Sequence, residues 1–310
     1  MSTTTSAESS SSSHCIVSPG QGVARVSFYA KGTNGANMGT TGHAEAALIP
    51  LESDRAGQMK KAYFRFYAEL DDLLSPLRRG QGLLYAFEAA SVKDAIEALG
   101  VPHTEVDLIL VNNEPAAFSY LLREGDRVSV YPVFRRLKLG PVTHLRPRSE
   151  GEIRFVLDAH LGKLAAYLRM LGFDSLHRSD CQDEELARIS ANQHRTLLSR
   201  DRGLLKRSVV IHGYLVRETQ PRQQLIEVVK RFDLSSLISP FQRCLHCNEP
   251  LRRVAKELVN DRLRPDTKLR YDQFHLCPKC GRVYWKGSHY RRMKALIEGM
   301  FPSVAGELQH

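Results

Sequence analysis

Long apolar runs are missing from this sequence. None of its 310 residues begins a stretch of about 18 consecutive apolar residues, which is the length that a membrane-spanning helix needs. The N-terminus also lacks the positively charged start and apolar centre of a secretory signal peptide. We therefore expect a soluble, cytoplasmic protein that has no membrane partner.

Cysteine is scarce as well, with six residues in the whole chain. Four of them form two CxxC pairs, Cys244 with Cys247 and Cys277 with Cys280, separated by 29 residues. These numbers suit a metal site in a reducing compartment better than a disulfide scaffold. Two such pairs supply the four thiolates of a closed structural zinc site, with iron as the minor alternative. Because no ligand position stays open, this Zn²⁺ is expected to hold the fold and to do no chemistry.

Acidic residues are too few to balance the basic ones. The chain has 44 Lys and Arg against 34 Asp and Glu, a net charge of +10, and residues 241–310 hold 14 basic and 7 acidic residues. This excess favours an anionic partner such as a nucleic acid, a ribosome or an acidic membrane surface. The 42% hydrophobic content is ordinary for a globular protein, and the length predicts two or three domains.

Residues 1–60 lack any sustained apolar period and are rich in Ser, Thr, Gly and Ala. A segment such as STTTSAESSSSS cannot bury enough apolar surface to offset the entropy that ordering would cost. The stretch ARVSFYAKG has the pattern of an isolated strand. We predict a disordered, low-complexity N-terminus over residues 1–60.

Residues 62–134 follow the order strand, strand, helix, strand, strand. The strands are AYFRFYAEL, GLLYAFEA, VDLILVNNEPA and DRVSVYPVF, and the helix is SVKDAIEALGVP. This order predicts a β-grasp domain and resembles the ubiquitin-like and sulfur-carrier proteins. The working C-terminal diglycine of the carriers is missing, since Gly140 stands alone before Pro141. We therefore expect a docking module for a protein partner, followed by a linker over residues 135–151.

Strands and helices alternate over residues 152–238. The strands are IRFVLD, FDSLHR, RTLLSRD and VVIHGYLV, and the helices cover 160–171, 182–193 and 221–232, with a short one near Leu204. This alternation predicts an α/β domain with a parallel sheet and flanking helices. The cysteine pairs then place a zinc ribbon at 240–297, followed by a tail at 298–310.

Two of these strands end in an aspartate, Asp158 and Asp201. Ligands of parallel sheets gather at the carboxyl ends of the strands. If the two strands are neighbours, the carboxylates lie side by side and repel each other unless a cation neutralises them. Oxygen ligands of this kind suit Mg²⁺ or Mn²⁺. The alternative for each residue is a helix N-cap, since aspartate is favoured there.

Asp183 is the third candidate acid. Asp183, Leu186 and Ile189 are spaced three apart, which places them on one helical stripe and predicts that Asp183 faces inward. The alternative is that an acidic residue is simply favourable at a helix N-terminus.

Several stretches together carry a resemblance to one family. They are FVLDAHLGKLAAYLRMLGFD, DEELARIS, LLSRDRGLL, CLHCNEPL and CPKCGRVYWKGSHYRRM. Residues 152–295 resemble the Mut-seven carboxy-terminal ribonuclease family, a PIN-like nuclease fold with a fused zinc ribbon. Residues 62–134 resemble the ubiquitin-like domain that accompanies this nuclease in some members. The resemblance implies a ribonuclease in which Asp158, Asp183 and Asp201 bind one or two catalytic Mg²⁺ or Mn²⁺ ions.

Basic and aromatic residues supply candidates for RNA binding. They form two groups: Arg200, Arg202 and Lys206, and then Lys286, His289, Tyr290, Arg291 and Arg292. Tyr284, Trp285 and Tyr290 interleave with the second group, which suits stacking on unpaired bases. The alternative is a solvated basic face over aromatics packed within a small zinc domain. We expect a ribonuclease that grips tRNA, rRNA or mRNA through its zinc ribbon, or else an RNA- or ribosome-binding adaptor that no longer cuts.

Overall fold

The computed structural model describes residues 59–132, 145 and 153–302, and the backbone of three strands near the N-terminus. These strands are β1 (Cys15–Gly20), β2 (Val23–Phe28) and β3 (Ala47–Leu48), and β1 pairs antiparallel with β2. They fall within the segment predicted to be disordered. The rest of residues 1–58, the linker apart from Leu145 and the tail from residue 303 lie outside the described residues. In the described part of the chain, no helix is long and apolar enough to cross a membrane.

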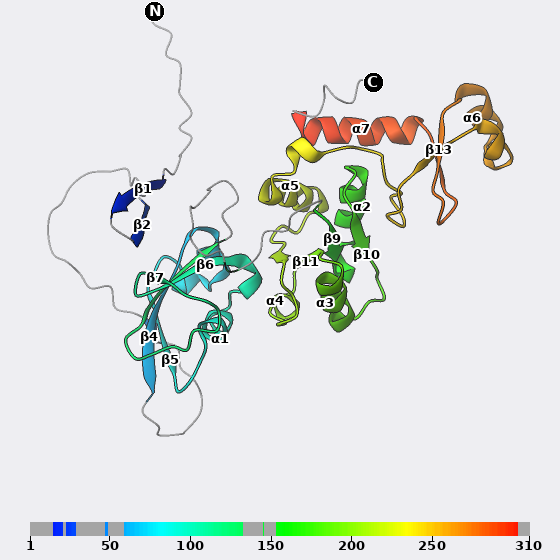
Figure 1. The fold of residues 1–310 in the computed structure, drawn as a ribbon. Helices are drawn as coiled ribbons and strands as arrows, with labels where there is room; N and C mark the ends of the chain where they lie inside the picture. Colours follow the sequence, from blue (N-terminus) through cyan, green and yellow to red (C-terminus); the bar gives the residue numbers. More distant parts are fainter. Residues whose placement is uncertain are drawn as a thin grey trace, which may run out of the picture. The chain divides into compact units, whose positions relative to one another are not determined.

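A mixed sheet with one helix forms the first domain (Figure 1). Its elements are β4 (Lys60–Phe66), η1 (Ala68–Leu73), η2 (Pro76–Arg78), β5 (Leu83–Phe87), α1 (Val92–Ala98), η3 (His103–Glu105), β6 (Val106–Val111), β7 (Glu114–Pro115) and β8 (Arg127–Pro132). The strand order is β3-β5-β4-β8-β6-β7, with β4 and β8 parallel at the centre. Ser91 caps α1 by accepting from Asp94 N–H, and Asp94 accepts from Ser91 N–H in return. The predicted β-grasp fold is confirmed.

A four-stranded parallel sheet forms the second domain. Its elements are β9 (Phe155–Leu157), η4 (Ala159–Leu161), α2 (Gly162–Met170), β10 (Ser175–His177), α3 (Asp183–Asn192), β11 (Thr196–Ser199), α4 (Arg202–Leu205), β12 (Gly213–Leu215), α5 (Pro221–Phe232) and η5 (Ser235–Leu237). The strand order is β10-β9-β11-β12, so β9 and β11 are neighbours. The predicted parallel sheet with flanking helices is confirmed.

Helices cover both faces of this sheet because side chains alternate along each strand. Phe155 and Leu157 of β9 pack in one apolar cluster with α2 and α5. Val156, between them, packs in a second cluster with α3 and α4. A sheet buried on both faces explains why its strands read as continuous apolar runs in the sequence.

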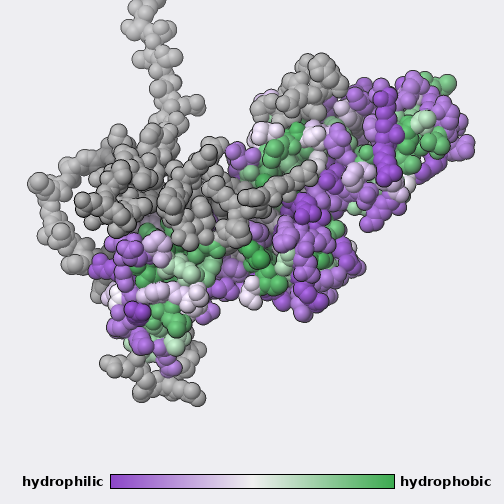
Figure 2. Space-filling model, viewed as in Figure 1, coloured by the Kyte–Doolittle hydropathy of each residue, from purple (hydrophilic) through white to green (hydrophobic). Residues whose placement is uncertain are grey.

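The zinc ribbon is a small antiparallel sheet followed by a long helix. Its elements are β13 (Arg252–Val254), η6 (Lys256–Leu258), η7 (Asn260–Arg262), α6 (Pro265–Arg270), β14 (Phe274–Leu276), β15 (Val283–Tyr284) and α7 (Ser288–Met300). Its own buried apolar core is limited to Val259, Leu263 and Phe274. Its surface is largely hydrophilic on the face drawn in Figure 2. Ile297 near the end of α7 is buried in the cluster of α2 and α5, so the helix returns to the core of the parallel-sheet domain.

The β-grasp domain covers the outer edge of the parallel sheet. Glu105 in η3 is fully buried, and its Oε1 accepts a hydrogen bond from the N–H of Leu215 in the edge strand β12 at 2.6 Å. Its other oxygen lies 3.9 Å from Arg231 and 4.0 Å from Arg217. Burial raises the pKa of Glu105, while Arg231, the Leu215 N–H and Arg217 act in the opposite direction. A backbone N–H of the edge strand β12, which has no further strand beside it among the described residues, is thereby satisfied by the Glu105 side chain of the β-grasp domain.

Candidate active site and metal centre

Asp158 follows β9 directly and is 5% exposed. Its Oδ1 accepts from the N–H of His160 at 2.8 Å, which makes Asp158 the N-cap of η4. Its Oδ2 accepts from the hydroxyl of Ser199 at 2.5 Å and from the N–H of Arg200 at 3.2 Å. The carboxylate therefore caps a helix and also ties β9 to the end of β11.

Asp201 follows β11 and is exposed. Its Oδ1 accepts from the N–H of Gly203 at 2.7 Å, so it caps α4. Its backbone N–H donates to the hydroxyl of Ser199 at 2.9 Å, and that hydroxyl in turn donates to Asp158. Ser199 thus joins the two strand-end aspartates, although a serine at the end of a strand gave no signal in the sequence.

Asp183 opens α3, and its side chain is exposed. This exposure contradicts the prediction, made from the spacing of Asp183, Leu186 and Ile189, that the Asp183 side chain faces inward. The buried residues of α3 are Leu186, Ala187 and Ser190, so burial begins one turn after Asp183. A spacing of three places residues on one side of a helix, but it does not show that the first turn on that side is buried.

The three aspartates do not form a tight ligand cluster. Within the described residues, the one group of three or more potential metal ligands whose atoms all lie within 4.8 Å of one another is the four cysteines. Asp158 and Asp201 meet through Ser199, at the carboxyl ends of neighbouring strands. Asp183 belongs to the same edge by topology, because α3 follows the parallel strand β10.

The first group of predicted RNA-binding residues is partly engaged inside the chain. Arg202 donates to the carbonyl of Gly100 at 3.3 Å, and Lys206 donates to the carbonyl of Glu97 at 2.5 Å. Both carbonyls lie at the C-terminal end of α1, where cations are favoured by the helix dipole. These two side chains therefore hold the β-grasp domain, whereas Arg200 is exposed.

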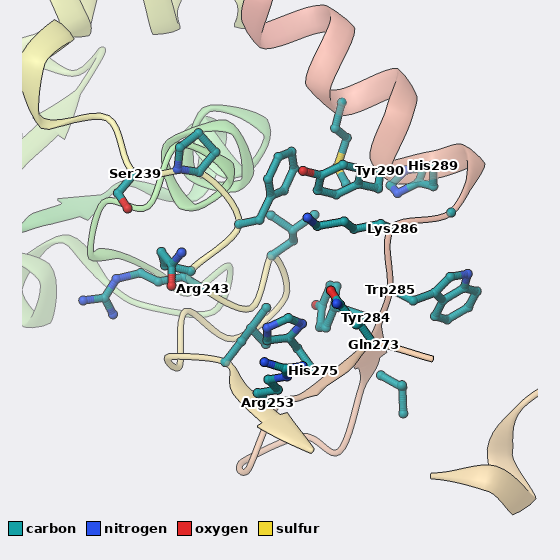
Figure 3. Close-up of a pocket in the computed structure, with 18 of the residues that line it drawn as sticks. Ser239, Arg243, Arg253, Gln273, His275, Tyr284, Trp285, Lys286, His289 and Tyr290 are labelled. Carbon is teal, nitrogen blue, oxygen red and sulfur yellow. The ribbon is translucent and has the colours of Figure 1, made fainter. Parts of the chain in front are cut away.

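The second group divides between a cavity and the open surface of the ribbon. Lys286, His289 and Tyr290 line a cavity at the start of α7 (Figure 3), but Arg291 and Arg292 lie outside its lining and are exposed. Tyr290 packs on Phe241 with ring centroids 4.4 Å apart. Trp285 is 38% exposed and contacts the core residue Phe274 at 6.5 Å between ring centroids.

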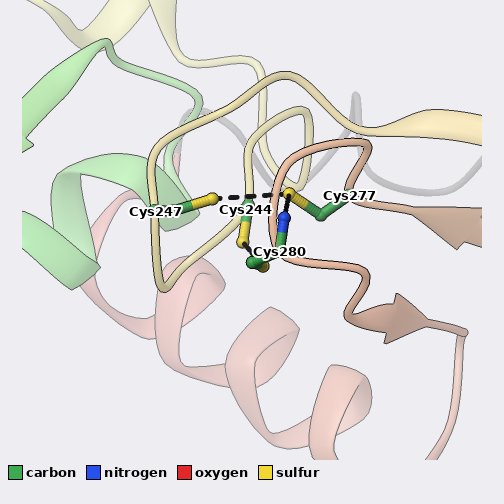
Figure 4. A group of neighbouring side chains, drawn as sticks. All are labelled: Cys244, Cys247, Cys277 and Cys280. Atoms are coloured by element: carbon green, nitrogen blue, oxygen red, sulfur yellow. Dashed lines mark hydrogen bonds between the residues drawn. The ribbon is translucent and has the colours of Figure 1, made fainter.

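The four cysteines converge from two loops (Figure 4). The Sγ atoms of Cys244 and Cys280 are 3.6 Å apart, and those of Cys247 and Cys277 are 3.4 Å apart. Tetrahedral zinc with bonds of about 2.3 Å places its sulfurs about 3.8 Å apart, so this spacing fits the ion. The predicted cysteine cluster is confirmed.

The ionisation of these thiols also fits a cation between them. Burial opposes ionisation of Cys244, but hydrogen bonds from Tyr284 and from backbone N–H groups lower the pKa of this thiol to about 6. Burial and the neighbouring thiols raise the pKa of Cys247 to about 12, and they also raise the pKa of Cys280. Four thiolates so close together need a divalent cation to ionise together.

A polar network anchors the first cysteine loop to the parallel-sheet domain. Arg169 of α2 is 5% exposed and donates to the carbonyls of Leu245 and His246 at 3.1 and 2.7 Å. Asn248 donates to Asp174 at 2.6 Å and accepts from the N–H of Ser175 at 2.8 Å. The sequence pattern did not indicate these residues, because their partners are more than 70 positions away.

Asp174 is the centre of this network. It accepts two hydrogen bonds from Arg195, at 2.6 and 3.2 Å, and a third from Asn248. Burial alone would raise the pKa of Asp174, but the hydrogen bonds from Arg195 and Asn248 outweigh it and hold the pKa below its usual value. The charged carboxylate of Asp174 therefore stabilises the folded state at pH values above the ordinary pKa of an aspartate.

We expect Asp174→Asn to lower the free energy of unfolding by about 1–3 kcal/mol at pH 7, because the amide offers Arg195 one oxygen acceptor where the carboxylate offers two. The contribution of the carboxylate is complete above its unfolded pKa of about 3.9 and is lost as the pH falls through the depressed folded pKa. The difference in stability between parent and variant should therefore be constant at neutral pH and narrow below about pH 4. Chemical unfolding of both proteins from pH 7 to 3 measures it, with Asp266→Asn on exposed α6 as the control. An equal difference at every pH would contradict the prediction.

Comparison with known families covers both halves of this architecture. A model described as the Mut7-C RNAse domain matches residues 153–297, and one described as Mut7-C ubiquitin matches residues 59–138. No curated protein and no solved structure matches the chain in the corresponding comparisons. The two family models together span well over half of the chain, in the order that the sequence predicted, and they cover the parallel sheet, the cysteine cluster and the β-grasp domain. The chain therefore carries a Mut7-C RNAse domain over residues 153–297, preceded by a Mut7-C ubiquitin-like domain over residues 59–138.

Proposed function

We propose that this protein is a metal-dependent ribonuclease that hydrolyses RNA phosphodiester bonds at the edge formed by Asp158 and Asp201. The observation that carries the proposal is the placement of these two carboxylates at the ends of neighbouring parallel strands, joined by the Ser199 hydroxyl. The match of residues 153–297 to the Mut7-C RNAse domain supports RNA as the substrate. Asp183 opens a helix at the same edge and completes the acidic set in this proposal.

The donor chemistry of this edge fits a hard divalent cation. Carboxylate oxygens are the ligands that Mg²⁺ and Mn²⁺ prefer, and Asp158, Asp183 and Asp201 would hold the ion. When bound, such an ion lowers the pKa of a water molecule and stabilises the charge that builds up on the phosphate.

The protein's own residues hold the carboxylates in place and supply the charges at this edge of the sheet. Asp158 is rigid because both of its oxygens accept hydrogen bonds from the protein. Asp201 presents an exposed carboxylate just after the neighbouring strand β11, and the exposed side chain of Arg200 is available to pair with a phosphate oxygen of the RNA. Together these residues would orient the phosphate of the RNA backbone against the acidic edge.

One observation favours the second candidate function, an RNA- or ribosome-binding adaptor. The three donors to the Asp158 carboxylate are all protein groups, so a structural role alone accounts for its burial. Arg202 and Lys206 are likewise engaged by the β-grasp domain. An adaptor would use the basic ribbon to bind RNA and would leave the strand intact.

A cleavage assay separates the two functions. We expect the purified full-length chain to cut a labelled single-stranded RNA when Mg²⁺ or Mn²⁺ is added, and to leave it intact in the same buffer without added metal. Omitting the ion is preferable to adding a chelator, because a chelator would also remove zinc from the cysteines. RNA that is bound but stays uncut with either metal would replace the ribonuclease proposal by the adaptor.

A further inference from the structure

A cavity of about 640 Å³ lies within the ribbon, and its use is not explained by the acidic edge or by the cysteines. Its walls are the three-stranded sheet, the segment 238–245 and the first turn of α7. Its volume is in the range of sites that hold small organic ligands, about 300–1,000 Å³. The cavity is therefore large enough for a nucleotide.

One wall is a polar row across the sheet. Arg253 of β13 is paired with His275 of β14, and His275 is paired with Tyr284 of β15. Residues paired directly across neighbouring strands share one face of the sheet, so the three side chains stand in a row. All three line the cavity, and Figure 3 shows them together on one side of it.

The opposite wall is aromatic and basic. Phe241 and Tyr290 pack with their rings tilted by 42°, and Tyr290 is only half-buried. Figure 3 shows the side chain of Lys286 between Tyr290 and the row of His275 and Arg253. A base that entered the cavity would therefore meet an aromatic surface on one side, with a cation beside it.

The charge of the lining is of one sign. Three cations, Arg243, Arg253 and Lys286, line the cavity, and none of the described residues lining it is acidic. Arg243 is held by the carbonyls of Gly172 and Asn248, while Arg253 and Lys286 are exposed. Cations that line a cavity with no acidic residue beside them in the lining favour an anionic ligand, and the exposed side chains of Arg253 and Lys286 are suited to phosphate.

We propose that this cavity binds one nucleotide of a single-stranded RNA, with its phosphate on Arg253 and Lys286 and its base on the Tyr290 ring. This inference rests on the proposed ribonuclease function for its ligand and assigns a nucleotide site away from the acidic edge. A phosphate alone would need only the cations, whereas the aromatic wall supplies stacking that every base can use. The site would grip an unpaired segment of the strand that the acidic edge cuts.

The test uses the full-length chain in buffer without added Mg²⁺ or Mn²⁺, so that binding is measured apart from cleavage. The probes are a fluorescent single-stranded oligonucleotide, adenosine 5′-monophosphate, adenosine and inorganic phosphate. We expect Arg253→Gln and Lys286→Gln each to weaken binding of the strand and of the monophosphate about tenfold, because each loses a charged hydrogen bond. Adenosine and phosphate should each bind more weakly than the monophosphate that combines them.

Arg252→Gln is the matched control, because Arg252 is exposed on the same strand but points to the other face of the sheet and does not line the cavity. It loses the same charge and should bind as the parent does. Tyr290→Leu should weaken binding of the strand about tenfold, because stacking is lost. Tyr290→Phe keeps the ring and should bind the strand as tightly as the parent does.

The proposal is overturned if Arg253→Gln and Lys286→Gln bind the strand as tightly as Arg252→Gln, or if inorganic phosphate binds as well as the monophosphate. Its failure is distinct from failure of the ribonuclease function. If only the nucleotide site is wrong, the cavity variants bind normally and cleavage with Mn²⁺ persists. If only the ribonuclease function is wrong, the cavity variants lose binding while the parent never cuts.

Discussion

Asp201→Asn is expected to abolish metal-dependent RNA cleavage, with a loss of at least about 100-fold, the scale of removing one key electrostatic group from an active site. The reason is charge, because asparagine keeps the size of the side chain but cannot supply a carboxylate to a cation. Stability should change by less than about 1 kcal/mol, since asparagine caps a helix as well as aspartate does and Asp201 is exposed. Cleavage of labelled RNA with Mn²⁺ and the thermal unfolding midpoint measure the two effects.

Asp158→Asn should lose cleavage in the same way but at a cost in stability. Its remaining oxygen can still cap η4, but an amide nitrogen cannot accept from the Ser199 hydroxyl and the Arg200 N–H. Leaving those donors without an acceptor costs about 1–3 kcal/mol. Asp201 is therefore the cleaner test of catalysis, and Asp266→Asn, with the same substitution on α6, should cut RNA at the parent rate. Parent-like cleavage by Asp201→Asn would end its role as a metal ligand.

The architecture was largely readable from local patterns. Apolar runs such as Phe155–Leu157 predicted buried parallel strands, and the 3.6-residue period predicted α2, α3 and α5 to within a few residues. A single sequence shows these patterns because each helix or strand buries one or both of its faces, and the buried positions are apolar. The same logic placed Asp158 and Asp201 at one edge, and the neighbouring order of β9 and β11 confirms that step.

The sequence failed where a residue's role depends on a distant partner. Nothing in the sequence around Glu105 indicates burial, yet this residue is fully buried against β12 and binds Leu215, 110 positions away. Arg202 and Lys206 looked like phosphate ligands, since nothing local indicates that they reach the end of α1. Asp183 shows a second limit. The spacing of residues along a helix shows which of them share one side, but it does not show whether the first turn on that side is buried. Charge and periodicity thus predict elements well and long-range polar pairs poorly.

Cys277→Ser is expected to release the metal and to unfold the ribbon. Structural zinc contributes on the order of 10 kcal/mol to the folding of small metal domains, and a core of Val259, Leu263 and Phe274 cannot replace that contribution. The first cysteine loop also adjoins Arg169, a buried guanidinium whose pKa is lowered by desolvation and supported by the charge of Cys244 and Cys247. Elemental analysis of the parent should give one zinc per chain, and the variant should hold none.

Cys181→Ser is the matched control, because Cys181 is also buried but lies in the parallel-sheet domain, outside the cysteine cluster. It should keep its zinc. Limited proteolysis should cut Cys277→Ser within residues 240–297 while a fragment containing residues 59–132 survives, since the β-grasp sheet packs in an apolar cluster that it shares with the parallel sheet and that contains no residue of the ribbon. Stoichiometric zinc in Cys277→Ser would show that three thiolates suffice to hold the ion. An equally resistant ribbon without zinc would show that Asp174, Asn248 and the return of α7 to the nuclease core hold the ribbon unaided.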